Sequence, residues 1–434
     1  MKLTAAILLI ASLLIFAGCS MSNKVNYSKE AVPCPSGNSA AESESPQLPW
    51  LNIDAWRGQG QLAFFREGRV YVLNGADGTL TMLNDTGPVN KLQWSPDGEW
   101  LAYLSDEEQL LIAKANGSTT HEIIGLPASA NFLDFAWSPN GDMLAITTGA
   151  DGEGIYLVGP GAILRQIISV DTFVSSFAWS PDGKTIAYVD TLPYDKEDPV
   201  NRDDALYIIP KEGGEPLRLH IEEESGIIIA GWHPDGKELL FWLNPGHGLS
   251  SCMDGLELYS LPLSGGEPNS LTTTLLDHQW RSWSPDGQKL LIVAGYGREY
   301  WFNKYLVLID TQTGTCTELP RRPGTLTFYP GWSPNGKHIS YLEAVELEGY
   351  PEDTSEIVAW EQTWSLWIAD PNGANARQLE EAGTGLKRAL WSRDGSHIVY
   401  LKDNAIWLIN IYGGSPAKIV DLMPGELNFT YSPT

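Results

Sequence analysis

Trp94-Ser95-Pro96-Asp97-Gly98 is one copy of a five-residue motif that recurs along the chain and decides its fold. The motif reads W-S-P-D-G, W-S-P-N-G, W-H-P-D-G or W-S-R-D-G, and its copies begin at Trp94, Trp137, Trp179, Trp232, Trp283, Trp332 and Trp391. They follow one another at a period of roughly 40 to 60 residues, which is typical of a β-propeller with one four-stranded sheet per repeat.

Each motif copy has the chemistry of a tight turn between two strands. Pro fits the second turn position, Asp or Asn the third, and Gly accepts the positive φ that closes the turn. Short apolar runs lie on both sides, such as Phe135-Ala136 before one copy and Leu101-Ala102-Tyr103 after another. The motif therefore predicts the hairpin between the first and second strands of a blade. We expect its Trp to be structural and to pack against the next blade.

The repeats predict an all-β fold, a single β-propeller of about eight four-stranded blades. Asn428–Pro433 resembles the start of another repeat but leaves no room for more strands. We interpret it as a C-terminal strand that completes the first blade and closes the ring, which removes an open sheet edge. A degenerate copy, W-R-G-Q-G at Trp56, competes for the same place. Seven blades with an irregular N-terminal piece therefore stay open as the alternative.

The N-terminus has the composition of an export signal. Lys2 supplies a positive charge and Ala5–Phe16 a short apolar stretch. Phe16-Ala17-Gly18-Cys19 resembles a bacterial lipobox, which implies a lipidated Cys19 and an anchored, extracytoplasmic protein. We thus predict a signal peptide at 1–18, the lipidated Cys19 with a flexible tether at 19–48, and the propeller at 49–434. A plain secretory signal is the alternative.

The charge balance excludes several classes of partner. The chain has 28 basic and 54 acidic residues, a formal net charge of −26. Such a surface argues against nucleic acid and against direct adhesion to anionic lipid, so membrane contact is expected through the lipid anchor only. It is compatible with cations or with a basic partner. The four cysteines show no metal-binding spacing.

The predicted loops differ greatly between the two faces of the propeller. Connections between the second and third strands lie on the face opposite the motif turns, and four consecutive blades carry long ones, at Thr191–Asp204, Asn244–Leu256, Gly295–Asn303 and Ala344–Trp364. Long loops gathered on one side of a rigid scaffold are typical of a binding site. Their candidate ligand-binding residues are Tyr194, Asp198, Arg202, Asp204, His247, Tyr296, Arg298, Tyr300, Trp301, Tyr350, Trp360 and Trp364.

Aromatic side chains beside carboxylates suit sugar rings or basic peptides. The alternative interpretation is that the aromatics attach the loops to the scaffold while the acids are solvated. The acidic stretch Asp195–Asp204 is also a candidate for Ca²⁺, although its spacing matches no EF-hand loop. No other cofactor and no further metal site is predicted.

Motifs for catalysis are absent from the sequence. It contains neither G-x-S-x-G nor H-E-x-x-H, and no catalytic residue can be chosen. Scattered carboxylates could still form an acid/base pair, so a carbohydrate-active or peptide-processing enzyme is the alternative from another class.

The pattern W-S-P-D-G-x-x-L-A-Y resembles the TolB-type, WD-repeat-like propellers, and the resemblance covers nearly the whole predicted mature chain. It implies protein contacts in the bacterial cell envelope. The chain departs from TolB in having more blades, no visible α/β domain and a lipid anchor. The sequence therefore predicts a membrane-anchored binding module for an envelope protein, peptide or glycan. An architectural role through the outer blade edges is a third interpretation.

Overall fold

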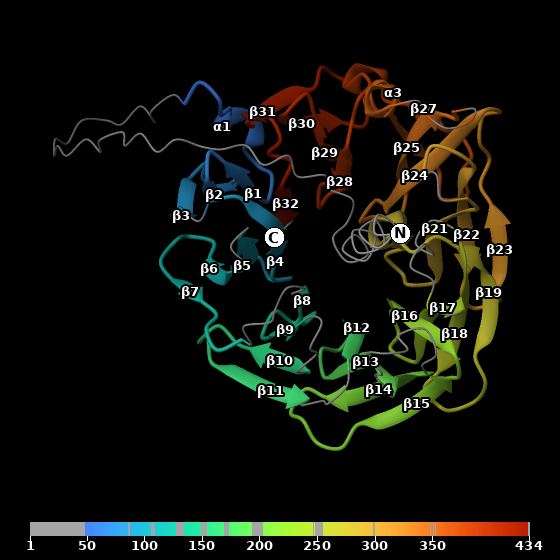
Figure 1. Ribbon diagram of the computed structural model, residues 1–434. Helices are drawn as coiled ribbons and strands as arrows, with labels where there is room; N and C mark the ends of the chain where they lie inside the picture. Colours follow the sequence, from blue (N-terminus) through green and yellow to red (C-terminus); the bar gives the residue numbers. More distant parts are fainter. Residues whose placement is uncertain are drawn as a thin grey trace, which may run out of the picture.

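The computed structural model describes residues 48–85, 87–105, 109–126, 134–148, 154–168, 173–192, 203–245, 247, 255–297, 300–347, 349, 351 and 353–432. Eight four-stranded antiparallel sheets follow one another around a ring, as Figure 1 shows. The predicted all-β propeller is confirmed, and eight blades are formed rather than seven. Cys19 and the segments 1–18 and 19–47 lie outside the described residues.

In blades 2 to 8 the strands run in chain order from the inside of the ring outward, whereas in blade 1 the C-terminal strand of the chain lies innermost (Figure 1). Blade 1 contains β32 (Phe429–Ser432), β1 (Gln61–Arg66), β2 (Arg69–Asn74) and β3 (Leu80–Asp85). Blade 2 contains β4 (Val89–Trp94), β5 (Trp100–Ser105), β6 (Leu110–Lys114) and β7 (Thr120–Glu122). Blade 3 contains β8 (Asp134–Trp137), β9 (Leu144–Thr147), β10 (Ile155–Val158) and β11 (Leu164–Ile168). Blade 4 contains β12 (Phe173–Trp179), β13 (Thr185–Leu192), β14 (Asp203–Pro210) and β15 (Leu217–Glu222).

The second half of the ring repeats this order. Blade 5 contains β16 (Ser225–Trp232), β17 (Glu238–Pro245), β18 (Leu256–Pro262) and β19 (Asn269–Thr274). Blade 6 contains β20 (Arg281–Trp283), β21 (Lys289–Gly295), β22 (Lys304–Asp310) and β23 (Thr315–Glu318). Blade 7 contains β24 (Thr325–Trp332), β25 (Ile339–Val345), β26 (Ser365–Ala369) and β27 (Arg377–Gln378). Blade 8 contains β28 (Arg388–Trp391), β29 (His397–Lys402), β30 (Ala405–Asn410) and β31 (Ala417–Asp421).

The described residues also form short helices between blades and in one loop. These are α1 (Ile53–Trp56), α3 (Thr354–Glu361) and two 3-10 helices, His278–Trp280 and Glu380–Ala382. Trp56 lies in α1, so its degenerate motif is not a strand turn. Its indole is fully buried, and it meets Tyr431 edge to face at 5.7 Å.

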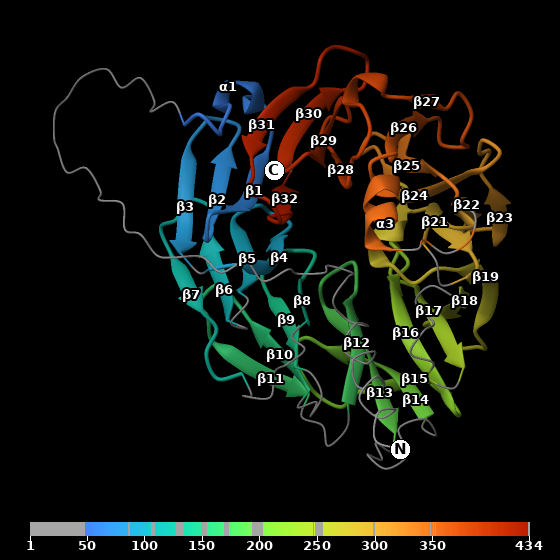
Figure 2. The same cartoon turned by 45° about the horizontal axis from the view of Figure 1, so that its top comes forward.

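The C-terminal strand closes the ring as predicted. β32 pairs with β1, and Tyr431 lies opposite Leu62 as Trp94 lies opposite Leu101 in blade 2. The first and last parts of the chain therefore share one blade, which Figures 1 and 2 show as a red strand among blue ones. Pairing of this strand leaves β1 no open edge.

The motif turn is built as the sequence predicted. In blade 2, the Gly98 N–H donates to the Ser95 carbonyl at 2.9 Å, and Gly98 has a φ of 71°. The Asp97 carboxylate accepts hydrogen bonds from the Ser95 hydroxyl at 2.5 Å and from the Glu99 N–H at 3.0 Å. A side chain at the Gly position would be strained by this φ, so the turn requires glycine.

The prediction for the motif Trp is wrong in one respect, because the indole contacts the preceding blade and not the next one. Trp137 donates from Nε1 to the Gln93 carbonyl, and Trp179 donates to Ala136 at 3.0 Å. Equivalent bonds extend from Trp94, Trp232 and Trp391 to Thr430, Ala178 and Gly331. Each acceptor directly precedes the motif position of its own blade. A chain of such bonds joins neighbouring inner strands.

The apolar core lies between the blades. One cluster joins Ala63 and Val72 of blade 1 to Trp94, Leu101 and Leu111 of blade 2. Comparable clusters fill the other blade interfaces, so each blade is stabilised mainly by its two neighbours. A ring of this kind is a rigid support for the loops at its faces.

Candidate functional site

The long connections between second and third strands occur where predicted, but the first one is shorter. β13 and β14 continue to the pairs Thr191↔Asp204 and Leu192↔Asp203, so the connection is 193–202. The others are 246–255, 296–303 and 346–364. The blade 3 connection, 148–154, is nearly as long as that of blade 6 because β9 ends early at Thr147. This longer connection was not predicted from the sequence.

Several predicted site residues lie outside the described residues: Tyr194, Asp198, Arg202, Arg298 and Tyr350. Most of the acidic stretch considered for Ca²⁺ lies there too. Among the described residues, no group of three or more His, Cys, Asp or Glu side chains is placed to hold a metal ion.

Asp204 was predicted to be a ligand-binding loop residue, but the structure places it in a strand. It lies in β14, is only 3% exposed, and accepts hydrogen bonds from the Thr191 hydroxyl at 2.7 Å and the Ile227 N–H at 2.8 Å. The first contact lies within blade 4, and the second joins blade 4 to blade 5. His247 lies in the next connection with a φ of 50°, and its N–H donates to the Asn244 carbonyl.

We call the face that carries the long loops the rim. The loops of blades 6 and 7 form one part of it, and aromatic rings pack beneath these two loops. We define the aromatic base as Tyr300, Phe328, Trp360 and Trp364. The Phe328 and Trp364 rings lie 4.7 Å apart, Trp360 and Trp364 5.3 Å, and Tyr300 and Trp360 5.5 Å. Trp360 and Trp364 are buried. These two predicted ligand-binding residues instead attach their loop to the scaffold, which was the alternative interpretation.

The helix α3 is fixed at both ends. Its first turn is capped by the Asp353 carboxylate, which accepts from the Ser355 N–H at 2.7 Å and the Glu356 N–H at 3.3 Å. Near its end, Trp360 donates from Nε1 to the Val345 carbonyl at 2.6 Å. Figure 2 shows α3 beside β24 and β25. Hydrogen bonds at both ends therefore fix the position of α3 in the rim.

A buried lysine holds the blade 6 loop. The Lys304 side chain is fully buried, and its ammonium donates to the carbonyls of Tyr296, Gly297 and Phe302 at 3.1, 3.1 and 2.8 Å. Charge-assisted bonds to carbonyls offset the cost of burying this cation. No sequence signal singled out Lys304, because nothing in its neighbours indicates a buried charge.

Hydrogen bonds of the backbone and of two side chains join the two loops into one unit. The Leu347 N–H donates to the Trp301 carbonyl at 3.1 Å, and Trp301 donates from Nε1 to the Gly349 carbonyl at 3.2 Å. The Asn303 N–H donates to the Glu346 carboxylate at 2.6 Å. Trp301 thus contributes to the site by connecting the loops of blades 6 and 7.

Large apolar side chains stand exposed on these linked loops. We define the apolar rim surface as Tyr296, Phe302, Val345 and Val358. Tyr296 is 64% exposed, and its ring meets the ring of Phe302 edge to face at 6.0 Å. Val345 and Val358 are also more than half exposed. Of these four residues, only Tyr296 was predicted from the sequence. Which side of each loop packs on the aromatic base decides whether Phe302, Val345 and Val358 are exposed, and the sequence does not show that side.

No helix in the described part of the chain is both long and apolar enough to cross a membrane.

Comparison with known proteins agrees with the fold. The family model for the WD40 domain of anaphase-promoting complex subunit 4 matches residues 92–180. An uncharacterized protein of Agrobacterium fabrum is 23% identical over 271 residues, covering 61% of this chain and 83% of its own length. The uncharacterized peptidase YuxL of Bacillus subtilis is 28% identical over 139 residues, covering 31% of this chain and 20% of its own length.

Solved structures share the propeller. Dipeptidyl peptidase 4 of Porphyromonas gingivalis matches with a TM-score of 0.58 and 12% identity, over 85% of this chain and 60% of that one. An oligogalacturonate lyase in complex with manganese matches with a TM-score of 0.51 and 13% identity, over 86% of this chain and 100% of that one. The putative TolB of Agrobacterium tumefaciens has a TM-score of 0.36 and 18% identity, over 62% of this chain and 87% of that one. At these identities the similarity to the dipeptidyl peptidase and to the lyase shows the fold alone.

Proposed function

We propose that this chain, a TolB-like, WD-repeat-like β-propeller, is a lipid-anchored binding module of the bacterial cell envelope. Its ligand is an extended segment of another envelope protein, which docks on the loops of blades 6 and 7. The observation that carries the proposal is the apolar rim surface, four exposed apolar side chains on two loops that packed aromatic rings and hydrogen bonds hold in place.

The rigidity of the base supports binding rather than incidental exposure. Since Trp360, Trp364 and Lys304 fix both loops, Tyr296 and Phe302 are presented in one arrangement before a partner arrives. Docking on a pre-formed surface avoids the entropy cost of ordering a flexible loop. Aromatic side chains that become buried at the centre of an interface commonly dominate its affinity.

The charge of the chain suggests what flanks the apolar contacts. The net charge is −26, and α3 exposes Glu356 beside its capping residue Asp353. A partner segment with apolar side chains between basic ones would complement this surface, and electrostatic attraction would speed its association. Polyanions would be repelled.

A direct test uses the full chain as bait for crosslinking in envelope extract. Deleting 344–364 is unsuitable, because it removes the buried Trp360 and Trp364 and damages the core. The double variant Tyr296→Ser, Phe302→Ser changes only exposed or half-buried groups. It should lose at least about 90% of a captured partner, since losing two aromatic contacts costs more than about 1.4 kcal/mol.

Tyr412→Ser is the matched control. Tyr412 is 69% exposed and lies in the turn between β30 and β31, on the opposite face. Equal capture by all three proteins would contradict the rim proposal and would direct attention to the blade edges or the turn face.

Anchoring has its own test. Cys19→Ala removes the only group proposed to carry lipid, so the protein should move from the membrane fraction to the soluble fraction. Partition of the variant with membranes, as for the unchanged chain, would contradict the anchor.

A further inference from the structure

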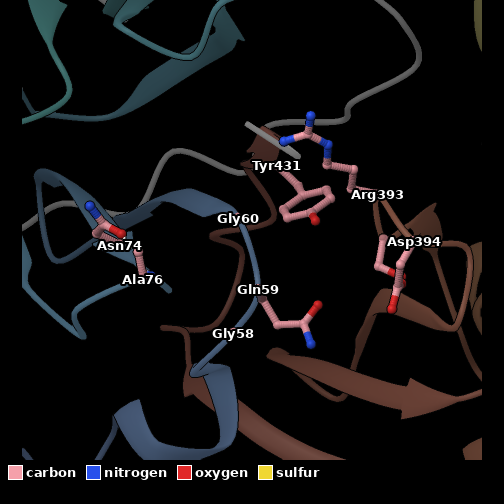
Figure 3. A pocket seen from close by; sticks show the side chains of 9 residues that line it. Gly58, Gln59, Gly60, Asn74, Ala76, Arg393, Asp394 and Tyr431 are labelled. Atoms are coloured by element: carbon pink, nitrogen blue, oxygen red, sulfur yellow. Dashed lines mark hydrogen bonds between the residues drawn. The ribbon is translucent and has the colours of Figure 1, made fainter.

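A hollow lies on the face of the motif turns, where blade 8 meets blade 1 (Figure 3). Its volume is about 570 Å³. It is lined by residues of the segment before β1, the turn after β2, the motif turn of blade 8 and the closing strand. These are Gly58, Gln59, Gly60, Asn74, Ala76, Ser392, Arg393, Asp394 and Tyr431.

Ring closure explains why the hollow is at this place. Blades 2 to 8 have a motif turn that joins their first two strands, whereas β32 and β1 come from distant parts of the chain. Tyr431 occupies the motif Trp position in blade 1, with a smaller side chain than the indole of the other seven. The missing turn and the smaller ring leave space between blades 8 and 1.

Besides Tyr431, Arg393 also departs from the repeat in this hollow. Six of the seven motif copies have Pro at this turn position, and only blade 8 has Arg. Pro is the better residue for the turn itself, because it fixes the required φ. Arg393 is exposed, and no hydrogen bond or ion pair joins its guanidinium to a described residue. The fold therefore gives no reason for the cation.

The other polar groups of the hollow can also form hydrogen bonds with a ligand. Figure 3 shows Gln59, Asp394 and the Tyr431 hydroxyl facing a common space. The Asp394 carboxylate accepts from the hydroxyls of Ser392 and Ser396, which hold its pKa at about 2, so it is ionised. Burial raises the pKa of the Tyr431 hydroxyl, so it keeps the proton that it can donate.

We propose that this hollow binds a neutral saccharide. Arg393 and Tyr431 donate, Asp394 accepts and the Gln59 amide does both, which suits hydroxyls that each donate one bond and accept another. The charges of Arg393 and Asp394 cancel, so neither an anion nor a cation is favoured. The volume is in the range of small-molecule sites. This site lies opposite the rim, so it is independent of the proposed function.

Two substitutions toward the repeat consensus test the site with little risk to the fold. Arg393→Pro restores W-S-P-D-G, and Tyr431→Trp restores the motif aromatic and fills space. Gln59→Ala removes the amide, and Gln288→Ala, at an exposed position on the same face of blade 6, is the matched control. Thermal unfolding of each variant shows that it is folded.

Binding is measured by saturation-transfer NMR with N-acetyl-D-glucosamine, D-galactose and maltose as probes. At least one probe should bind with a Kd on the order of 1 mM, and Arg393→Pro and Gln59→Ala should weaken it about tenfold or more while Gln288→Ala leaves it unchanged. No transfer to any probe, or equal transfer in all variants, would overturn the proposal. Binding of the zwitterion alanyl-alanine in preference to all three sugars would overturn the ligand class.

Discussion

The motif tryptophan has a role that its spacing alone does not reveal. The repeat predicted a structural residue, but the direction of its contact depends on the twist between blades, which the sequence does not encode locally. Trp179 and four equivalents donate to the preceding blade. Trp332 differs, since its buried Nε1 has no hydrogen-bond partner in the described structure.

This difference gives a matched pair of variants. Trp179→Phe removes an indole of similar burial to that of Trp332 and also the hydrogen bond to the Ala136 carbonyl. We expect Trp179→Phe to lower stability by about 1 kcal/mol more than Trp332→Phe, because only the first leaves a carbonyl unpaired. Thermal unfolding of the two variants side by side measures this. A larger loss for Trp332→Phe would contradict the assignment.

The motif carboxylates make stability depend on pH. Hydroxyl and backbone N–H donors lower the pKa of Asp394 to about 2 and also lower the pKa of Asp182 and Asp286. Unfolded Asp has a pKa of about 3.9. A lowered folded pKa contributes stability that is fully present above the unfolded value and lost as pH falls through the folded value.

We therefore expect Tm to fall between about pH 4 and pH 2, and less steeply in Asp394→Asn. Asn is a suitable replacement because Asn335 forms the same turn contact in blade 7, accepting from the Lys337 N–H. Tm measured across this pH range gives the comparison. Identical slopes for variant and unchanged chain would show that Asp394 has no part in the effect.

At the scale of elements, the two rim loops behave as one structure. The sequence predicted where the loops are and that they carry aromatic residues, because insertions interrupt a regular repeat. It did not distinguish buried Trp360 and Trp364 from exposed Tyr296, since all lie in loops of similar composition. Burial is decided by contacts with Phe328 in β24 and Lys304 in β22, which come from other parts of the chain.

Lys304→Met tests how the blade 6 loop is held. Methionine keeps the approximate length of the side chain but leaves the carbonyls of Tyr296, Gly297 and Phe302 without their charged donor. Amide exchange in 296–303 should speed up about tenfold or more, with little change in distant blades. The exposed Lys337→Met is the control. Unchanged exchange in both variants would contradict the role of Lys304.

For the whole molecule, the sequence predicted the propeller, eight blades and closure by the C-terminal strand. It left seven blades open because W-R-G-Q-G at Trp56 imitates a motif turn. The structure resolves this through α1, whose Trp56 fills space beneath Tyr431 instead of starting a blade. Which loop residues meet a ligand could not be predicted, since that depends on contacts between distant blades.

Closure by β32 should govern the stability of the ring. A chain that ends at Gly425 loses the buried Phe429 and the Thr430 carbonyl bonded by Trp94, and it exposes the edge of β1. We expect a markedly lower Tm and association between molecules through the open edge. Thermal unfolding and size-exclusion chromatography measure both. A monomer with unchanged Tm would show that closure contributes little.

Binding of an envelope protein to the apolar rim surface can be measured with the captured partner. The partner is purified and titrated by calorimetry into the unchanged chain, Tyr296→Ala and Tyr412→Ala. We predict that Tyr296→Ala raises the Kd at least about tenfold while Tyr412→Ala leaves it unchanged. Equal affinity for all three proteins, or a loss confined to Tyr412→Ala, would contradict binding at this surface.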